Sequence, residues 1–227
     1  EWRRCVPPST PSFFSLANSA IYSRGLKAAT VRDAIVRIGL AGARDLLFQV
    51  VYATSTVGLP RFQTQVLKSY QRSVYSGIAA KTICRRLQLR YAFDYLSGLL
   101  HDIGESRIYR ILATIPGAAT DTKTVDDIVM RYHPKAGAEL AAAWQLPSDI
   151  VDVCEAHHEL GAESRLPVRV VMLSDLVVAA AERPGFSNEP LPEEPRMREL
   201  GMKADDITYV VDLVRAATRG TKEEAKA

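Results

Sequence analysis

The side chains best suited to chemistry are four histidines that all lie between positions 101 and 158. Each falls at a predicted helix end or junction, where side chains from different helices can converge. One of them is followed directly by an aspartate, and imidazole and carboxylate are common ligands of divalent transition metals. The pattern predicts a metal site that includes His101, Asp102, His133, His157 and His158.

A sixth candidate, Asp175, lies in the segment 168–180, which is apolar nearly all round and is predicted to be a buried helix. An unpaired carboxylate there would be costly, so Asp175 needs a cation, a histidine or hydrogen-bond donors. Together, the six residues could bind one or two metals, and a metal-activated water beside a phosphate ester would give hydrolysis. The alternative is a polar network in which Asp175 pairs with His101 or His157 and holds the helices in register.

Helical periodicity dominates the chain and no segment shows sustained alternation, so the sequence predicts an all-α fold. Thr30 and Asp33 resemble a capping box, and Gly39 and Gly42 interrupt the helix that follows. His133 precedes Pro134, and because proline is favoured as a first helical residue, His133 is predicted at a helix start. Other helices are expected over 43–51, 62–87, 92–100, 147–158, 166–182 and 204–218, with a short helix capped by Thr124 and a Pro-rich loop over 183–197.

Five segments between about residue 14 and residue 181 carry a resemblance to a known family. They are Leu16–Tyr22, Ala34–Gly39, Gly98–Gly104, His133–Gly137 and Ala143–Pro147. With the His-Asp pair, the later His-His pair and the aspartate in an apolar helix, they resemble the HD superfamily of phosphohydrolases. The Gly-Leu-Leu-His-Asp-Ile-Gly and Trp-x-Leu-Pro segments are similar in particular to its HDOD branch.

The resemblance implies an HD-like helical bundle with a smaller N-terminal helical lobe. It also implies a divalent metal (Fe, Mn, Zn, Ni or Mg) held by the six candidate residues. The HDOD branch is regarded as a bacterial signal-transduction module, so we expect protein partners and, as a further ligand, a nucleotide or phosphate. We place the N-terminal lobe at residues 1–60, the HD-like bundle at 61–182, and a Pro-rich loop, a final helix and a tail at 183–227.

Three departures from the pattern of HD hydrolases leave catalysis open. Arg72 stands near the position at which those enzymes have a further histidine. Glu105 stands where hydrolases of cyclic dinucleotides have a lysine, and its charge would repel a phosphate. Their Gly-Tyr-Pro motif is missing after the paired histidines. Two hypotheses remain: a regulatory module that binds a partner or ligand, and a metal-dependent phosphohydrolase acting on a phosphate ester or nucleotide, with Asp102 as the catalytic residue.

The composition indicates a folded protein. The 227 residues are 47% hydrophobic and 24% charged, a composition that can bury a sizeable core and that argues against wholesale disorder. No stretch approaches the roughly 18 uncharged apolar residues that a membrane span needs, and the opening residues have no apolar signal-peptide core. We therefore expect a cytoplasmic protein without membrane contact. Cys5, Cys84 and Cys154 are then expected as reduced thiols, with Cys154 a core residue rather than a zinc ligand.

Positive charge gathers in the first half of the chain, since residues 1–110 hold 16 Lys and Arg against 6 Asp and Glu. A basic half can indicate a nucleic-acid partner, and Arg85, Arg86 and Arg90 form a basic cluster. However, helix surfaces need solvating charge in any case, and no platform of stacking aromatic residues accompanies these side chains. Nucleic acid is therefore not expected as a partner.

Overall fold

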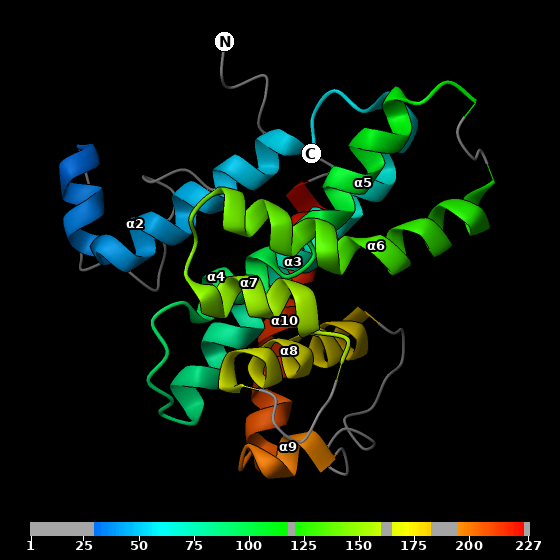
Figure 1. The fold of residues 1–227 in the computed structure, drawn as a ribbon. Coiled ribbons are helices and arrows are strands. Elements are labelled where there is room, and N and C mark those ends of the chain that lie inside the picture. The colour runs from blue at the N-terminus through cyan, green and yellow to red at the C-terminus, as the bar shows by residue number, and fades with distance from the viewer. Residues whose placement is uncertain (1–29, 118–120, 160–164, 183–194, 225–227) are drawn as a thin grey trace. The chain divides into compact units, whose positions relative to one another are not determined.

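The computed structural model describes residues 30–117, 121–159, 165–182 and 195–224, which form helices joined by turns (Figure 1). These described residues include no strand, so the all-α prediction is confirmed. The chain divides into two compact units, residues 1–57 and 58–227.

The described part of the first unit is helix α2 (Val31–Ser55). It begins with a capping box, in which the Asp33 N–H donates to the Thr30 hydroxyl over 3.1 Å and the Thr30 N–H donates to the Asp33 carboxylate over 3.0 Å. Gly39 has φ 76° and ψ 167°, a conformation that glycine adopts without steric cost. The predicted interruption is therefore confirmed at Gly39 as a kink, whereas Gly42 continues the helix.

The second unit is a helical bundle around the long helix α3 (Gln63–Arg86). Its other elements, in chain order, are η2 (Pro60–Phe62), α4 (Asp94–Leu100), α5 (Ile103–Thr114), α6 (Thr122–Ala143), α7 (Ser148–Ala156), α8 (Leu166–Glu182), α9 (Pro195–Glu199) and α10 (Ala204–Glu224). Helix α3 packs against α4, α5, α8 and α10, and α6 packs against both α5 and α7. The final helix α10 is thus part of the bundle.

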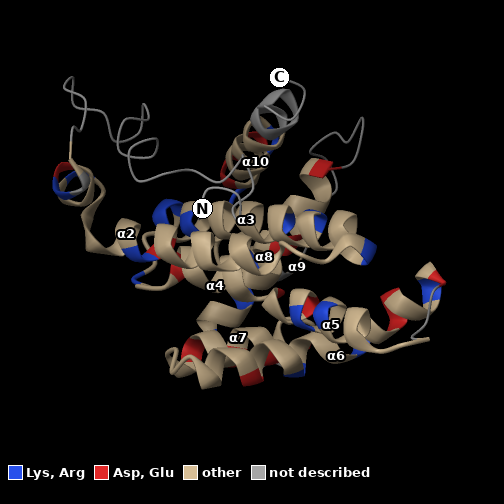
Figure 2. Ribbon diagram, turned by 90° about the horizontal axis from the view of Figure 1, so that it is seen from above, with Lys and Arg blue, Asp and Glu red and all other residues tan. Residues whose placement is uncertain are grey.

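Apolar clusters between neighbouring helices hold this unit together, and two of them join several elements each. The larger joins α3, α8 and α10 through residues such as Ile83, Leu173 and Val210, none of which is exposed. The second joins η2, α5 and α6 around Phe62 and Tyr109, whose ring centroids lie 5.3 Å apart. Helix α8 begins and ends where the apolar pattern predicted, and it carries few charged residues (Figure 2).

Two glycines let the helices around the histidines approach closely. A Cβ at Gly98 in α4 would lie 2.5 Å from the Ser76 carbonyl oxygen and 2.7 Å from the Gly77 nitrogen in α3. A Cβ at Gly104 in α5 would overlap the carbonyl oxygen of His133 in α6. Because both obstacles are backbone atoms, neither can yield easily. The two glycines of the Gly-Leu-Leu-His-Asp-Ile-Gly segment therefore mark the helix crossings on either side of His101 and Asp102.

Three sequence predictions about element boundaries are wrong. Helix α6 is capped by Asp121, whose carboxylate accepts from the Thr124 N–H over 2.8 Å, so Thr124 is not the cap. The helix then continues through Pro134, which places His133 inside α6 rather than at a helix start. A proline in a helix interior loses its own backbone hydrogen bond and crowds the carbonyl four residues earlier, and the packing of α6 on α5 and α7 offsets that cost. The predicted loop is cut short by α9, of which Pro195 is the first residue, while residues 183–194 lie outside the described residues.

None of the helices in the described part of the chain combines the length and the apolar character that crossing a membrane requires.

Candidate metal centre

The structure brings the histidines together from three parts of the bundle. His101 and Asp102 form the turn between α4 and α5, His133 projects from the middle of α6, and His157 and His158 follow the end of α7. The contacts of α6 with α5 and α7, and of α4 with α7, gather these positions. Residues far apart in sequence thus form one polar cluster.

Asp102 lies at the centre of this cluster. Its Oδ1 atom is 3.1 Å from His157 Nε2 and 3.3 Å from His133 Nε2, and its Oδ2 atom is 3.0 Å from His101 Nε2. His133 Nε2 in turn lies 3.2 Å from His157 Nε2 and 2.9 Å from His158 Nε2. One ligand atom from each of Asp102, His133, His157 and His158 lies within 4.8 Å of all the others. We call these four residues the ligand cluster.

Backbone carbonyls fix the orientation of three of the imidazole rings. Nδ1 of His101 lies 2.8 Å from the Gly98 oxygen, Nδ1 of His133 lies 2.9 Å from the Val129 oxygen, and Nδ1 of His157 lies 3.0 Å from the oxygens of Val153 and Cys154. A carbonyl only accepts, so each Nδ1 carries the proton. In the neutral ring, the lone pair is then on Nε2, which faces Asp102.

This arrangement fits a divalent metal. The Nε2 lone pairs of His133 and His157 repel one another at 3.2 Å unless a proton or a metal ion lies between them. The Nε2 atom of His158 lies 2.9 Å from that of His133 and can either donate a proton to it or offer a further lone pair to a metal. His101 Nε2 is buried and has no hydrogen-bond partner, because its contact with Asp102 lacks hydrogen-bond geometry. Three imidazoles with one carboxylate suit Zn, Fe, Mn or Ni better than Mg, which prefers oxygen ligands.

The electrostatics of the cluster keep the carboxylate charged. Burial raises the pKa of Asp102, but the charge of His101 and the hydrogen bonds of the imidazoles hold it well below its ordinary value. Burial lowers the pKa of His101, yet the nearby Asp102 outweighs burial and raises it to about 9. Burial together with His157 and His133 lowers the pKa of His158 to about 4. An ionised Asp102 and a neutral His158 are the forms that bind a metal.

Asp175 differs from its sequence prediction in burial and in partner. Helix α8 is largely buried, but the Asp175 side chain is 36% exposed because it lies at the open side of the cluster. Its Oδ1 atom lies 3.2 Å from Arg72 Nη2, so its charge is paired with an arginine and not with His101 or His157. The predicted burial of this carboxylate is therefore wrong, and Asp175 is not part of the ligand cluster.

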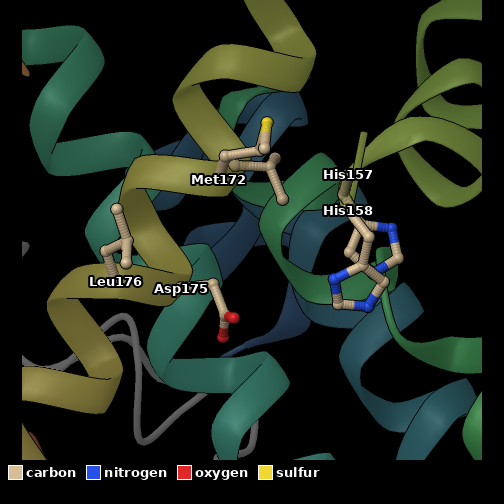
Figure 3. A pocket seen from close by; sticks show the side chains of 6 residues that line it. His157, His158, Met172, Asp175 and Leu176 are labelled. Carbon is tan, nitrogen blue, oxygen red and sulfur yellow. The ribbon is translucent and has the colours of Figure 1, made fainter. Parts of the chain in front are cut away.

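A small pocket opens beside the ligand cluster. Its volume is about 190 Å³, and its lining comes from the His pair after α7 and from α8 (Figure 3). Asp175 lines it together with His157 and His158, which places this residue beside the imidazoles although it does not contact them. The apolar lining residues have no signature of their own in the sequence, although their helical spacing from Asp175 could have indicated them: Val171, Met172 and Leu176.

Two other candidate side chains have structural roles. The Cys154 thiol is fully buried, donates to the Leu100 carbonyl over 3.3 Å, and has its pKa raised to about 12 by burial and by Asp102. It lies outside the ligand cluster, as expected for a core residue. In the basic cluster, Arg86 pairs with Asp206 in α10 over 2.6 Å and lies over the Tyr209 ring, so this arginine joins two helices.

Glu105, one turn after Asp102, lies close to the cluster. Burial raises the pKa of this carboxyl, the charge of Asp102 raises it further, and the Ser69 hydroxyl bonded to it opposes the shift. A carboxyl of this kind adds negative charge beside the cluster only when it ionises, which its surroundings disfavour.

Comparisons with known proteins agree with this architecture. A family model, the HDOD domain, matches residues 10–160. A cyclic di-GMP phosphodiesterase of Pseudomonas aeruginosa is 31% identical over 158 residues, which cover 63% of this chain and 37% of that protein. The chain spans only 25% to 37% of the length of the curated relatives that it matches.

Two solved structures share the fold. One, from Shewanella amazonensis and assigned as a metal-dependent phosphohydrolase, has a TM-score of 0.66 at 18% identity and covers 89% of this chain and 79% of its own. The other, an HDOD domain protein of unknown function from Geobacter sulfurreducens, has a TM-score of 0.65 at 24% identity. The match covers 90% of this chain and 79% of that protein's chain. The family model, which matches well over half of the residues, decides the assignment: this chain belongs to the HDOD domain family.

Proposed function

We propose that this chain is a regulatory module of bacterial signal transduction that binds a divalent metal at its ligand cluster and acts by binding a protein partner. The observation that carries the metal site is the ligand cluster, in which one ligand atom from each of the four residues lies within 4.8 Å of all the others and Nδ1 of His133 and of His157 is held by backbone carbonyls. A transition metal such as Zn, Fe, Mn or Ni matches these ligands. The cytoplasm is the compartment we expect for such a module.

The proposal assigns Asp102, His133, His157 and His158 as metal ligands. His101 orients Asp102 from the other side, since its Nε2 lies 3.0 Å from Oδ2. Asp175, which was predicted as a sixth ligand, is kept from that role by Arg72. The site therefore uses fewer ligands than the family resemblance implied.

A regulatory role is favoured over catalysis by the surroundings of the cluster. Arg72 occupies the place at which a further histidine ligand was expected, and its charge is already balanced by Asp175. Glu105 stands where an enzyme would need a cation for a phosphate, and a carboxyl cannot serve that purpose. The side chains that would complete a hydrolytic site thus have other partners.

Metal-dependent phosphohydrolysis is the second candidate function. The pocket beside His158 and Asp175 favours it, because a phosphate ester entering there would reach the ligand cluster. A bound metal would supply Lewis-acid activation of the phosphoryl group or of a water molecule. A distant relative that acts on a cyclic dinucleotide adds support for a nucleotide ligand.

Substitution of Asp102 by Ala separates these functions. The purified chain and D102A would be compared for bound metal, for hydrolysis of a cyclic dinucleotide and of a generic phosphate ester, and for partner capture. A regulatory module has no metal-dependent turnover in the unsubstituted chain, whereas an enzyme turns over and loses all activity in D102A. Metal content near zero in the unsubstituted chain, after growth with each of several metals, would rule out the metal site.

A further inference from the structure

The carboxylate of Asp102 has two sides with different surroundings. Oδ1 faces His133 and His157, which belong to the ligand cluster, whereas Oδ2 faces His101. His101 Nε2 is buried and without a hydrogen-bond partner, so in the neutral ring its lone pair is available to a cation. The potential ligands there are His101 and Oδ2 of Asp102, and the charge of Asp175 lies close enough to act on His101.

Arg72 already supplies a cation to Asp175. Its Nη2 atom lies 3.2 Å from Asp175 Oδ1, and its Nε atom lies 3.6 Å from Glu182 Oε2. Both acidic residues belong to α8, and Arg72 reaches them from the middle of α3. The guanidinium is about one third exposed and carries the positive charge at this position.

Asp175 is also held on the side of the imidazoles. It lines the same small pocket as His157 and His158, which follow the end of α7, whereas Asp175 belongs to α8 (Figure 3). A cation bound among Asp175, His101 and Asp102 would therefore lie beside the ligand cluster. It would also have to approach the guanidinium that Asp175 already binds, and like charges at such short range repel strongly.

We propose that the Arg72 guanidinium takes the place of a second metal ion beside Asp175, so that the unsubstituted chain binds one metal ion instead of two. This inference rests on the proposed metal site, because it takes the ligand cluster as the first position. It explains why Asp175 and His101 lie so near the cluster without belonging to it. Removing the charge of Arg72 would leave two carboxylates and an imidazole facing an unfilled cation position.

The test measures Mn²⁺ or Zn²⁺ bound per chain, after dialysis and by calorimetric titration, for the full chain and three variants. R72K keeps the charge and is the matched control. R72Q removes the charge, and R72H replaces it with a metal ligand. We expect about one ion per chain in the unsubstituted protein and in R72K, and about twice that in R72H and R72Q.

Each outcome bears on one of the two proposals. An unchanged stoichiometry of one in both R72H and R72Q, with circular dichroism showing folded proteins, overturns the role of Arg72 and leaves the metal site intact. Two ions in the unsubstituted chain also overturn it. No bound metal in any protein removes the proposed function itself. If R72H does not fold, R72Q alone tests the role of Arg72, since the same increase in bound metal is expected for it. In either case the unsubstituted chain must bind metal in a single calorimetric step.

Discussion

Gly104 of α5 and His133 of α6 meet backbone to backbone, so that the smallest side chain at position 104 would overlap the His133 carbonyl oxygen. This contact sets the position of His133 relative to Asp102, which lies two residues before Gly104. The glycine is therefore needed for the geometry of the cluster as well as for packing.

Substitution of Gly104 by Ala is predicted to destabilise the protein by about 3 kcal/mol and to weaken metal binding, because the added methyl group forces α5 away from α6. Chemical denaturation and metal titration measure both effects. Gly137 on α6 provides the control, since a Cβ there would lie 3.4 Å from its nearest neighbours, an ordinary contact. G137A should remain within about 1 kcal/mol of the unsubstituted chain. Equal stability of G104A and G137A would show that the close crossing does not constrain the fold.

Replacing Asp102 by Asn is predicted to lower metal affinity by roughly 100-fold, because a neutral amide loses the charge that faces three imidazoles. Cys154 is the matched control: its thiol is fully buried close to the same residues, but it donates to the Leu100 carbonyl. C154A should bind metal as tightly as the unsubstituted chain. Calorimetry with Zn²⁺ or Mn²⁺ measures the difference, and weakened binding in C154A alone would point to a different ligand set.

Removal of metal is predicted to lower the thermal stability of the protein. A ligand that binds only the folded state adds about 2.7 kcal/mol at a concentration 100 times its dissociation constant. A chelator should therefore lower the Tm of the metal-loaded chain by several degrees, and excess metal should restore it. The same chelator should leave the Tm of an H133A/H157A variant unchanged. A chelator effect of equal size in that variant would place the stabilising metal elsewhere.

Asp206 is predicted to make stability depend on pH in the acid range. Its carboxylate accepts from the Lys203 N–H over 3.1 Å and from Arg86 over 2.6 Å, and these bonds lower its pKa below the ordinary value of 3.8. The lowered pKa means that the stabilisation is complete above pH 3.8 and is lost as the pH falls through the pKa of the folded state.

Substitution of Asp206 by Asn should therefore cost about 1 kcal/mol at neutral pH. The difference in the free energy of unfolding between D206N and the unsubstituted chain should shrink below pH 4, because protonation removes the same charge from Asp206. Urea denaturation at a series of pH values measures it. Asp205, which is exposed in the same turn, is the control position. A difference between D206N and the unsubstituted chain that is constant across this range would contradict the assigned ion pair.

Local sequence signals predicted the helices where the pattern was strong and unbroken. Helix α8 begins at Leu166 and ends at Glu182 as its apolar run indicated. His133 was placed at a helix start because Pro134 usually begins a helix, but packing on two neighbours keeps α6 continuous through it. The intrinsic helix propensity of a residue fixes a helix boundary only where tertiary contacts do not override it.

The residues of the ligand cluster could be predicted more fully than the ion pair that lies beside it. Residue type and order pointed to Asp102, His133, His157 and His158, because few other side chains in an apolar bundle can bind a metal. The pairing of Arg72 with Asp175 joins residues 103 positions apart and has no local signature, so only the folded chain shows it. The exposure of Asp175 could not be predicted either, because the apolar residues around it in sequence indicated a buried position.

The metal site can be tested most directly by anomalous X-ray scattering from crystals grown with Zn²⁺ or Mn²⁺. We predict one strong peak within about 2.5 Å of ligand atoms from Asp102, His133, His157 and His158. The absence of an anomalous peak among these four side chains, in crystals whose solution holds saturating metal, would contradict the proposed metal site.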